Sequence, residues 1–317
     1  MTVYTDRSAD SNFEATLMRR IRSGEIAPEA VASHIPPFFL KVQIQTVSPC
    51  NASCTMCPWP STKDLPQGAM SDAMFATLVD QMVGRGVERV SLFLMNEPLL
   101  DRKLAARTAL VKRRMPESAS VIYTNGSLLD EACAAALAEA GLDELNVSVN
   151  GFDRDTYVKW MPGIDYDRVM ANLRTVAALR RQGRLGAMRV RLAVLDLPGA
   201  RDGAAAFTAE TDLEISLRPT TNRAGSVDPA ALGVHHELDD KPIACQRPFV
   251  KAYVLYNGDL VLCNCDWRRT TILGNLRDRS LAELWHDARL NEIRAAHARR
   301  MFPSDLLCAK CDYPYMR

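Results

Sequence analysis

Short apolar runs alternate with longer helical patterns through most of this chain. Between residues 39 and 219 the β-branched runs predict six strands, at Phe39–Gln45, Arg89–Phe93, Ser120–Tyr123, Glu144–Val149, Met188–Leu195 and Glu214–Leu217. The patterns between them have helical spacing; one follows a candidate N-cap, Ser71, and ends at Gly84 and Gly86. Strands separated by helices predict parallel βαβ units.

The pattern changes beyond the sixth strand. Residues 220–241 are rich in turn formers and are interpreted as a domain connection. Two further strands, Lys251–Tyr256 and Leu260–Cys263, flank Asn257-Gly258, which predicts a hairpin with a type I′ turn. A helix then begins with a capping box at Ser280 and continues towards His297. We therefore expect three segments: a lead-in over residues 1–36 with a short helix around 13–23, a core over 37–225 and a smaller domain over 226–317.

Composition narrows the class of protein. The chain has 317 residues, 47% hydrophobic and 24% charged, which is enough apolar surface for a sizeable core. Thirty-nine Lys and Arg residues balance 38 Asp and Glu residues, so no overall positive field would attract nucleic acid. No apolar run is long enough to cross a membrane and the start lacks a secretory pattern, so we expect a cytoplasmic protein without a membrane partner. Nine cysteines in such a protein indicate metal ligands or reactive thiols rather than disulfides.

Three of these cysteines form a compact motif directly after the first predicted strand. Cys50, Cys54 and Cys57 have the spacing C-x3-C-x2-C. Loops at the carboxyl ends of barrel strands form the active sites of such folds. Three thiolates can hold three irons of a cubane cluster and leave the fourth iron open, whereas structural zinc sites normally have four ligands. A zinc site or three unrelated thiols are the alternatives.

This motif resembles the signature of the radical S-adenosylmethionine (SAM) enzymes, with Met56 where that family often has an aromatic residue. The resemblance implies a partial (β/α)6 TIM-like barrel, a [4Fe–4S] cluster whose open iron binds the amino and carboxylate groups of SAM, and a 5′-deoxyadenosyl radical that abstracts a substrate hydrogen. It also implies an external one-electron reductant of the flavodoxin or ferredoxin type.

Other strand ends carry weaker signals of the same family. Met95-Asn96-Glu97-Pro98 lies where the family has a GGEP-like motif, which implies that Glu97 accepts a hydrogen bond from the SAM ammonium, although both glycines are absent. Further residues resemble the family's contacts to the SAM carboxylate and ribose: Thr124, Asn125, Ser148 and Asn150. Each alone could equally be an ordinary turn or cap residue.

A second group of cysteines lies in the smaller domain. Cys245, Cys263, Cys308 and Cys311 are spaced C-x17-C-x44-C-x2-C, which suits either zinc or an iron–sulfur cluster. Behind a radical-SAM motif, the group resembles the twitch type of auxiliary-cluster domain, a shortened SPASM domain. The resemblance then implies two [4Fe–4S] clusters in the chain, with SAM as co-substrate.

Two cysteines remain outside both groups. Cys133 lies in an alanine-rich helical segment and reads as a small buried hydrophobic residue. Cys265 lies two residues after Cys263, so in extended chain both side chains would share a face. It is a spare cluster ligand, a bystander thiol or a catalytic hydrogen-atom donor, and we favour the donor because an S–H bond is weaker than the C–H bonds of a sugar.

These features favour one function and leave others open. A donor cysteine and a twitch-like domain resemble radical-SAM epimerases that invert a sugar carbon of an aminoglycoside, and this is the predicted function, with a small amino-sugar substrate. The alternatives are a twitch-type dehydrogenase that oxidises an aminocyclitol or sugar alcohol to a ketone, a peptide-modifying enzyme, and a zinc-stabilised binding protein. For a polycationic substrate, carboxylates at Asp196, Glu214 and Asp266 are candidates by position, although each is more typical of a surface residue.

Overall fold

A nine-stranded sheet forms the centre of the molecule, for which a computed structural model describes residues 12–316. The order of its strands is β6-β5-β4-β3-β2-β1-β7-β8-β9. The strands are β1 (Lys41–Ile44), β2 (Arg89–Ser91), β3 (Ala119–Thr124), β4 (Glu144–Ser148), β5 (Arg189–Leu195), β6 (Glu214–Arg218), β7 (Lys251–Val254), β8 (Asp259–Val261) and β9 (Ile272–Asn275). The predicted six strands of the core are thus confirmed, and they pair in parallel in chain order.

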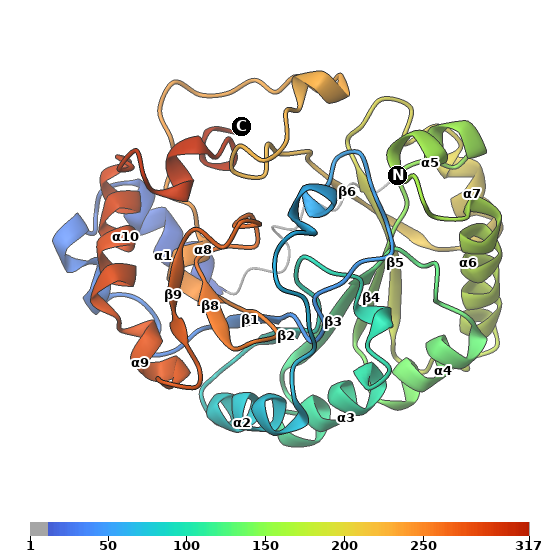
Figure 1. The fold of residues 1–317 in the computed structure, drawn as a ribbon, viewed down its shortest axis with the longest axis horizontal. Coiled ribbons are helices and arrows are strands. Elements are labelled where there is room, and N and C mark those ends of the chain that lie inside the picture. The colour runs from blue at the N-terminus through green and yellow to red at the C-terminus, as the bar shows by residue number, and fades with distance from the viewer. Residues whose placement is uncertain (1–11, 317) are drawn as a thin grey trace.

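Helices lie along the outer side of the curved sheet (Figure 1). They are α1 (Asn12–Arg22), α2 (Asp72–Met82), α3 (Leu104–Arg114), α4 (Glu131–Glu139), α5 (Arg154–Trp160), α6 (Tyr166–Arg181), α7 (Ala204–Thr211), α8 (Arg247–Val250), α9 (Leu281–Trp285) and α10 (Ala288–Arg299). The predicted cap of α2 is present, because Ser71 Oγ accepts from the N–H of Met74 at 3.2 Å. The α/β class and the open, partial barrel are confirmed.

The two faces of the barrel sheet differ in polarity. Val42, Ile122 and Leu192 have no exposed surface and belong to the main apolar core. Alternate residues lie on the opposite face of the sheet. That face carries polar side chains, among them Gln43, Ser91, Tyr123, Asn146, Arg191, Ser216 and Arg218. The interior of the barrel is therefore a polar surface, and the loops beyond the carboxyl ends of the strands surround its mouth.

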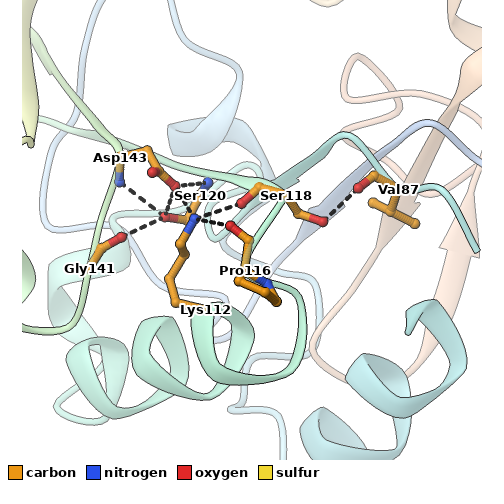
Figure 2. A network of polar contacts seen from close by, with 7 residues as sticks. All are labelled: Val87, Lys112, Pro116, Ser118, Ser120, Gly141 and Asp143. Atoms are coloured by element: carbon orange, nitrogen blue, oxygen red, sulfur yellow. Dashed lines mark hydrogen bonds and ion pairs between the residues drawn. The ribbon is translucent and has the colours of Figure 1, made fainter. Parts of the chain in front are cut away.

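The amino ends of the strands are joined by a separate polar network (Figure 2). Asp143 Oδ2 accepts from Lys112 Nζ at 2.8 Å and from the Ser120 N–H at 2.7 Å. Lys112 Nζ also donates to the carbonyl of Ser118 at 2.9 Å, and the Ser118 hydroxyl donates to the Val87 carbonyl at 2.6 Å. This network ties α3 to the starts of β3 and β4, at the end of the barrel opposite the cysteine loop.

The C-terminal strands extend the barrel sheet itself. β7 pairs in parallel with β1, and β8 and β9 follow as antiparallel neighbours. The hairpin between β7 and β8 was predicted, but its type I′ turn was wrong. Gly258 has φ +92° and Asn257 does not have a positive φ; Asn257 instead uses its side-chain oxygen to accept from the N–H of Asp259 at 3.3 Å. A glycine with positive φ after the turn supplies the reversal.

The last helical segment is two helices rather than one. The capping box at Ser280 and Glu283 is present and begins α9. The chain leaves the helical conformation at Asp287, whose side chain accepts from the N–H of Arg289 at 2.9 Å and caps α10. An N-cap residue between two apolar segments thus explains the break that the pattern did not predict.

The N-terminal helix packs against the start of the C-terminal domain. Leu17 and Ile21 of α1 share an apolar cluster with Phe249 and Val250. Glu14, which has no exposed surface, forms an ion pair with Lys41 Nζ at 2.5 Å. The predicted lead-in helix is confirmed, whereas the expectation for residues 1–11 lies outside the described residues. Over residues 12–316, no helix combines the length and hydropathy needed to cross a membrane.

Candidate active site

The first three cysteines lie in a loop that leaves the carboxyl end of β1. The N–H of Cys57 donates to the carbonyl of Cys54 at 3.1 Å, and the N–H of Trp59 reaches the sulfur of Cys57 at 3.5 Å. Burial raises the pKa of Cys50 to about 12, with Glu97 and Cys57 adding to the effect. Cys50 and Cys57 likewise add to the rise that burial causes in the pKa of Cys54, so the three cysteines lie near one another in this loop.

Hydrogen bonds fix this loop to the turns after the next two strands. The N–H of Glu97 donates to the carbonyl of Pro49 at 3.1 Å. Asn51 accepts from Asn125 Nδ2 at 2.8 Å and donates to Ser127 Oγ at 2.9 Å. Asn51 was not expected from the sequence, because a single polar residue within a cysteine motif produces no hydrophobic periodicity. It links the cysteine loop directly to the turn after β3.

Glu97 is a buried carboxylate with a full set of donors. It is 2% exposed, and its oxygens accept from the hydroxyl of Thr124 at 2.6 Å and from the N–H groups of Asn125 at 2.7 Å and Leu99 at 2.9 Å. Burial nonetheless raises the pKa of Glu97 above its usual range. These bonds hold the carboxylate at the carboxyl end of β2, next to the cysteine loop.

The side chains of the other predicted SAM contacts take part in more hydrogen bonds within the protein than the sequence suggested. Thr124 and Asn125 are buried and support Glu97, and Asn150 Oδ1 accepts from the N–H of Leu195 at 2.9 Å. Ser148 is half-buried at the end of β4. All four lie at successive strand ends, but Thr124 and Asn150 already use an oxygen for internal bonds. Their role towards SAM stays a prediction.

Five cysteines gather in the C-terminal domain. Besides the expected Cys245, Cys263, Cys308 and Cys311, Cys265 is buried among them, with 2% of its surface exposed. Burial raises the pKa of Cys311 to about 12, and Cys265 adds to this shift. The segment after Cys263 is a turn and not extended chain. Even so, the sulfurs of Cys263 and Cys265 approach the same side-chain oxygen of Asn264, at 3.4 and 3.8 Å.

The backbone N–H of Cys265 reaches the sulfur of Cys263 at 3.4 Å. Two side-chain nitrogen donors also contact these sulfurs, and neither was expected from the sequence. Arg247 Nη1 lies 3.2 Å from the sulfur of Cys263 and 3.3 Å from that of Cys265. His297 Nε2 lies 3.3 Å from the sulfur of Cys308, while its Nδ1 accepts from the N–H of Cys245, also at 3.3 Å. Burial lowers the pKa of His297 to about 3, so the ring is neutral and donates from Nε2.

The two groups of cysteines face the same connection between the domains. Burial raises the pKa of Cys57, and the charge of Arg223 opposes that rise. The hydrogen bond with Cys263 is the main cause that lowers the pKa of Cys265, and the guanidinium groups of Arg247 and Arg223 add to it. Asn222 beside it accepts from the N–H of Asp312 at 3.1 Å and donates its own N–H to Asp312 at 2.7 Å. These two hydrogen bonds join the connection between the domains to the loop that contains Cys308 and Cys311.

The remaining candidates are placed differently from the predictions. Cys133 is half-buried on α4 rather than fully buried. Glu214 begins β6, so it lies at the amino end, away from the site, and it pairs with Arg191. Asp266 is buried and accepts from the N–H groups of Thr270 and Thr271, both at 2.7 Å. Asp196 forms an exposed ion pair with Arg201. Of the three candidate carboxylates, only Asp196 lies on the surface at the carboxyl end of a strand.

Family models match both parts of the chain. The model of the radical SAM superfamily matches residues 44–185, and that of the SPASM iron–sulfur cluster-binding domain matches residues 245–312. The chain thus carries a radical SAM domain followed by a SPASM domain. As a radical SAM enzyme with a SPASM-type domain, it uses SAM and two [4Fe–4S] clusters.

Individual relatives share this architecture. The S-adenosyl-L-methionine-dependent 2-deoxy-scyllo-inosamine dehydrogenase of Niallia circulans is 22% identical over 86% of this chain and 93% of its own. The crystal structure of BtrN in complex with AdoMet and 2-DOIA matches with a TM-score of 0.60 at 20% identity, covering 88% of this chain and 99% of that one. Streptococcus suis SuiB bound to precursor peptide SuiA gives 0.66 at 16% identity, covering 88% and 70%. At these identities the two structures show a common fold.

The donor sets fit the two clusters. Among the described residues, no three His, Cys, Asp or Glu side chains are grouped to hold one metal ion. A cubane cluster binds each thiolate at a different iron, so its ligands need not converge on one point. Soft, partly buried sulfurs with N–H donors beside them, as at Cys57 and Cys263, suit such a cluster.

Proposed function

We propose that this radical SAM enzyme oxidises a hydroxyl-bearing carbon of an aminocyclitol or amino sugar to a ketone. One observation carries the proposal: the likeness to the 2-deoxy-scyllo-inosamine dehydrogenase runs through both domains and covers 93% of that enzyme. A shared barrel alone would support only the radical chemistry. The shared auxiliary domain supports the same final step, in which the substrate radical gives up an electron.

The proposed ligands follow the two cysteine groups. Cys50, Cys54 and Cys57 hold the first cluster, and Cys245, Cys263, Cys308 and Cys311 hold the auxiliary cluster. When bound, SAM and the first cluster supply a 5′-deoxyadenosyl radical, and the auxiliary cluster supplies an acceptor for one electron. Glu97 accepts a hydrogen bond from the SAM ammonium, and Thr124 and Asn125 hold Glu97 in place. By the same resemblance, Ser148 and Asn150, at the end of β4, contact the carboxylate or the ribose of SAM.

Oxidation of the substrate carbon balances as follows. The carbon would lose a hydrogen atom to the deoxyadenosyl radical; its hydroxyl group would then lose a proton to solvent, and one electron would pass from the carbon to the auxiliary cluster. The product is a ketone, and one SAM is consumed for each turnover. The electron that starts the reaction comes from a flavodoxin- or ferredoxin-type reductant.

A second function is favoured by the position of Cys265. A buried thiol next to a proposed cluster ligand can return a hydrogen atom to the substrate carbon from the opposite face, which inverts that carbon. The reaction would then be an epimerisation of the neomycin C to neomycin B type, in which the carbon keeps its substituents and is not oxidised. One electron, passed from the external reductant through the auxiliary cluster, and one proton from solvent would return the thiyl radical to a thiol.

Turnover in deuterium oxide separates the two functions. The reconstituted enzyme is incubated with SAM, dithionite and a panel of aminocyclitols and aminoglycosides, and the Cys265→Ala variant is tested in parallel. For the dehydrogenase we expect a ketone and undiminished turnover by Cys265→Ala. An epimer with one deuterium at the inverted carbon, absent from Cys265→Ala, would replace this function with epimerisation. Deoxyadenosine formation only with a peptide substrate would overturn both.

A further inference from the structure

Arg247 is a half-buried cation whose hydrogen-bond acceptors are sulfur atoms. It lies on α8, two residues after Cys245, and its Nη1 approaches the sulfurs of Cys263 at 3.2 Å and Cys265 at 3.3 Å. One terminal guanidinium nitrogen carries two hydrogens, so it can donate one to each sulfur. The two cysteines are thus joined through a single atom of Arg247.

Packing holds the guanidinium in this position. Its carbon lies 4.4 Å from the centre of the Tyr313 ring, which is the stacking geometry of a cation–π contact. Across residues 12–316, no carboxylate forms an ion pair with Arg247. Cysteines that bind a cluster are thiolates, so a ligand sulfur would supply the negative charge that a guanidinium with few water contacts requires.

A hydrogen bond to a ligand sulfur changes the reduction potential of an iron–sulfur cluster. A nearby positive charge stabilises the reduced cluster, which carries one more electron, and so raises the potential. His297 also donates to a ligand sulfur, that of Cys308, but its neutral ring adds no charge. Of the two donors Arg247 and His297, only Arg247 adds both a hydrogen bond and a full positive charge.

We propose that Arg247 is a positioning residue of the auxiliary cluster: by binding the sulfurs of Cys263 and Cys265 together, it raises the reduction potential of that cluster and keeps Cys265 beside it. The inference rests on the proposed ligand role of Cys263. A higher potential makes the cluster a better electron acceptor, which the proposed oxidation requires. Nothing in the proposal depends on the identity of the substrate.

The test is a redox titration of the full-length holoenzyme followed by electron paramagnetic resonance. Arg247→Met removes the charge and the donor, whereas Arg247→Lys keeps the charge on a side chain that cannot repeat the planar geometry. The control is Arg294→Met: Arg294 is a fully buried arginine of the same domain and lies over the Trp285 ring, but it donates to carbonyl oxygens such as that of Pro248. The Cys54→Ala variant identifies the signal of the auxiliary cluster.

We expect Arg247→Met to retain full iron and to shift the one-electron reduction equilibrium of the auxiliary cluster about tenfold against reduction, which is about 59 mV. Arg247→Lys should shift it less, and Arg294→Met should lower the melting temperature without moving the potential. An unchanged potential in Arg247→Met at full iron would overturn the proposal, as would an equal shift in Arg294→Met. If Arg247→Met loses the cluster, the potential of Arg247→Lys is measured instead, and an unchanged potential at full iron would overturn the proposal.

The measurement is independent of the reaction. Because no substrate is present, a shifted potential in an enzyme that forms neither ketone nor epimer would refute the proposed function and leave this inference intact. Full iron in Cys263→Ala would show that Cys263 is not a ligand and would overturn the inference itself.

Discussion

At the scale of single residues, the turn after β2 shows how the chain forms a family motif without its glycines. Met95 has φ +52°, a left-handed conformation that glycine adopts without strain and other residues adopt at a cost of about 1–2 kcal/mol. Asn96 supports the turn, because its Oδ1 accepts from the N–H of Leu94 at 2.7 Å. Glu97 is then presented to the site. The turn before Glu97 therefore forms without the two glycines of the family motif.

This strain predicts opposite effects of two substitutions at Met95. Met95→Val places a β-branched side chain in the left-handed region and should lower the free energy of unfolding by about 2 kcal/mol. Met95→Gly removes the strain but also some packing, so it should change stability by less than about 1 kcal/mol. Urea unfolding of the reconstituted variants measures both. Equal losses in the two variants would show that the side chain, and not the backbone, determines stability here.

The bonds around Glu97 predict a double defect in Glu97→Gln. The amide group of glutamine would face at least one of the donors from Thr124, Asn125 and Leu99, and an unsatisfied buried donor costs about 1–3 kcal/mol. Loss of the charge should also weaken SAM binding by about tenfold. Unfolding and equilibrium dialysis with SAM measure these effects. Glu131→Gln, at an exposed ion pair on α4, is the control and should leave both unchanged.

At the scale of elements, polar bonds stabilise the end of the barrel that carries no chemistry. Asp143 is held by Lys112 and by the N–H and hydroxyl of Ser120, at 2.7–2.8 Å (Figure 2). Burial opposes the charge of Asp143, but these bonds outweigh it and leave its pKa below the ordinary value. The pair lies between the starts of β3 and β4 and so supports their register.

The direction of this pKa shift fixes the pH dependence. Because the folded pKa lies below the unfolded one, the stability from Asp143 is fully present above about pH 4 and is lost as the pH falls through the folded pKa. Asp143→Asn should lower the free energy of unfolding by about 1 kcal/mol at pH 7, since the pair is partly exposed. It should cost less below pH 3. A constant difference between the proteins at pH 7 and pH 3 would exclude a contribution from charge.

At the scale of the whole molecule, the sequence predicts what local patterns encode. The parallel strands are short β-branched runs between helical patterns, and Ser71 and Ser280 are local caps, so these elements were found. The pairing of β7 with β1 joins residues about 210 positions apart, and no local pattern encodes such a partner. Likewise, the cysteine spacing predicted both groups of thiols, but Arg247 and His297 reach their sulfurs through tertiary packing and were missed.

The continuous sheet links the auxiliary cluster to the stability of the barrel. Cys263 follows β8, and β8 is joined through β7 to β1, whose carboxyl end leads to Cys50. A metal site contributes its binding free energy to the folding of the segment that holds it. Losing the auxiliary cluster should therefore weaken strands on both sides of β1, whereas losing the first cluster should affect mainly its own loop.

Two cysteine variants, Cys308→Ala and Cys54→Ala, test this coupling, and a third, Cys133→Ala, is the control. Cys308→Ala and Cys54→Ala should each reduce iron from about eight to about four per chain, but only Cys308→Ala should lower the melting temperature markedly and expose β7–β9 to protease. Cys54→Ala should abolish deoxyadenosine formation and keep the C-terminal strands protected. Cys133→Ala, which changes a half-buried cysteine on α4, should keep both clusters. If Cys54→Ala and Cys308→Ala proved equally sensitive to protease across β7–β9, the first cluster would have to stabilise the C-terminal domain as well, and the one-sided coupling argued from the sheet order would be wrong.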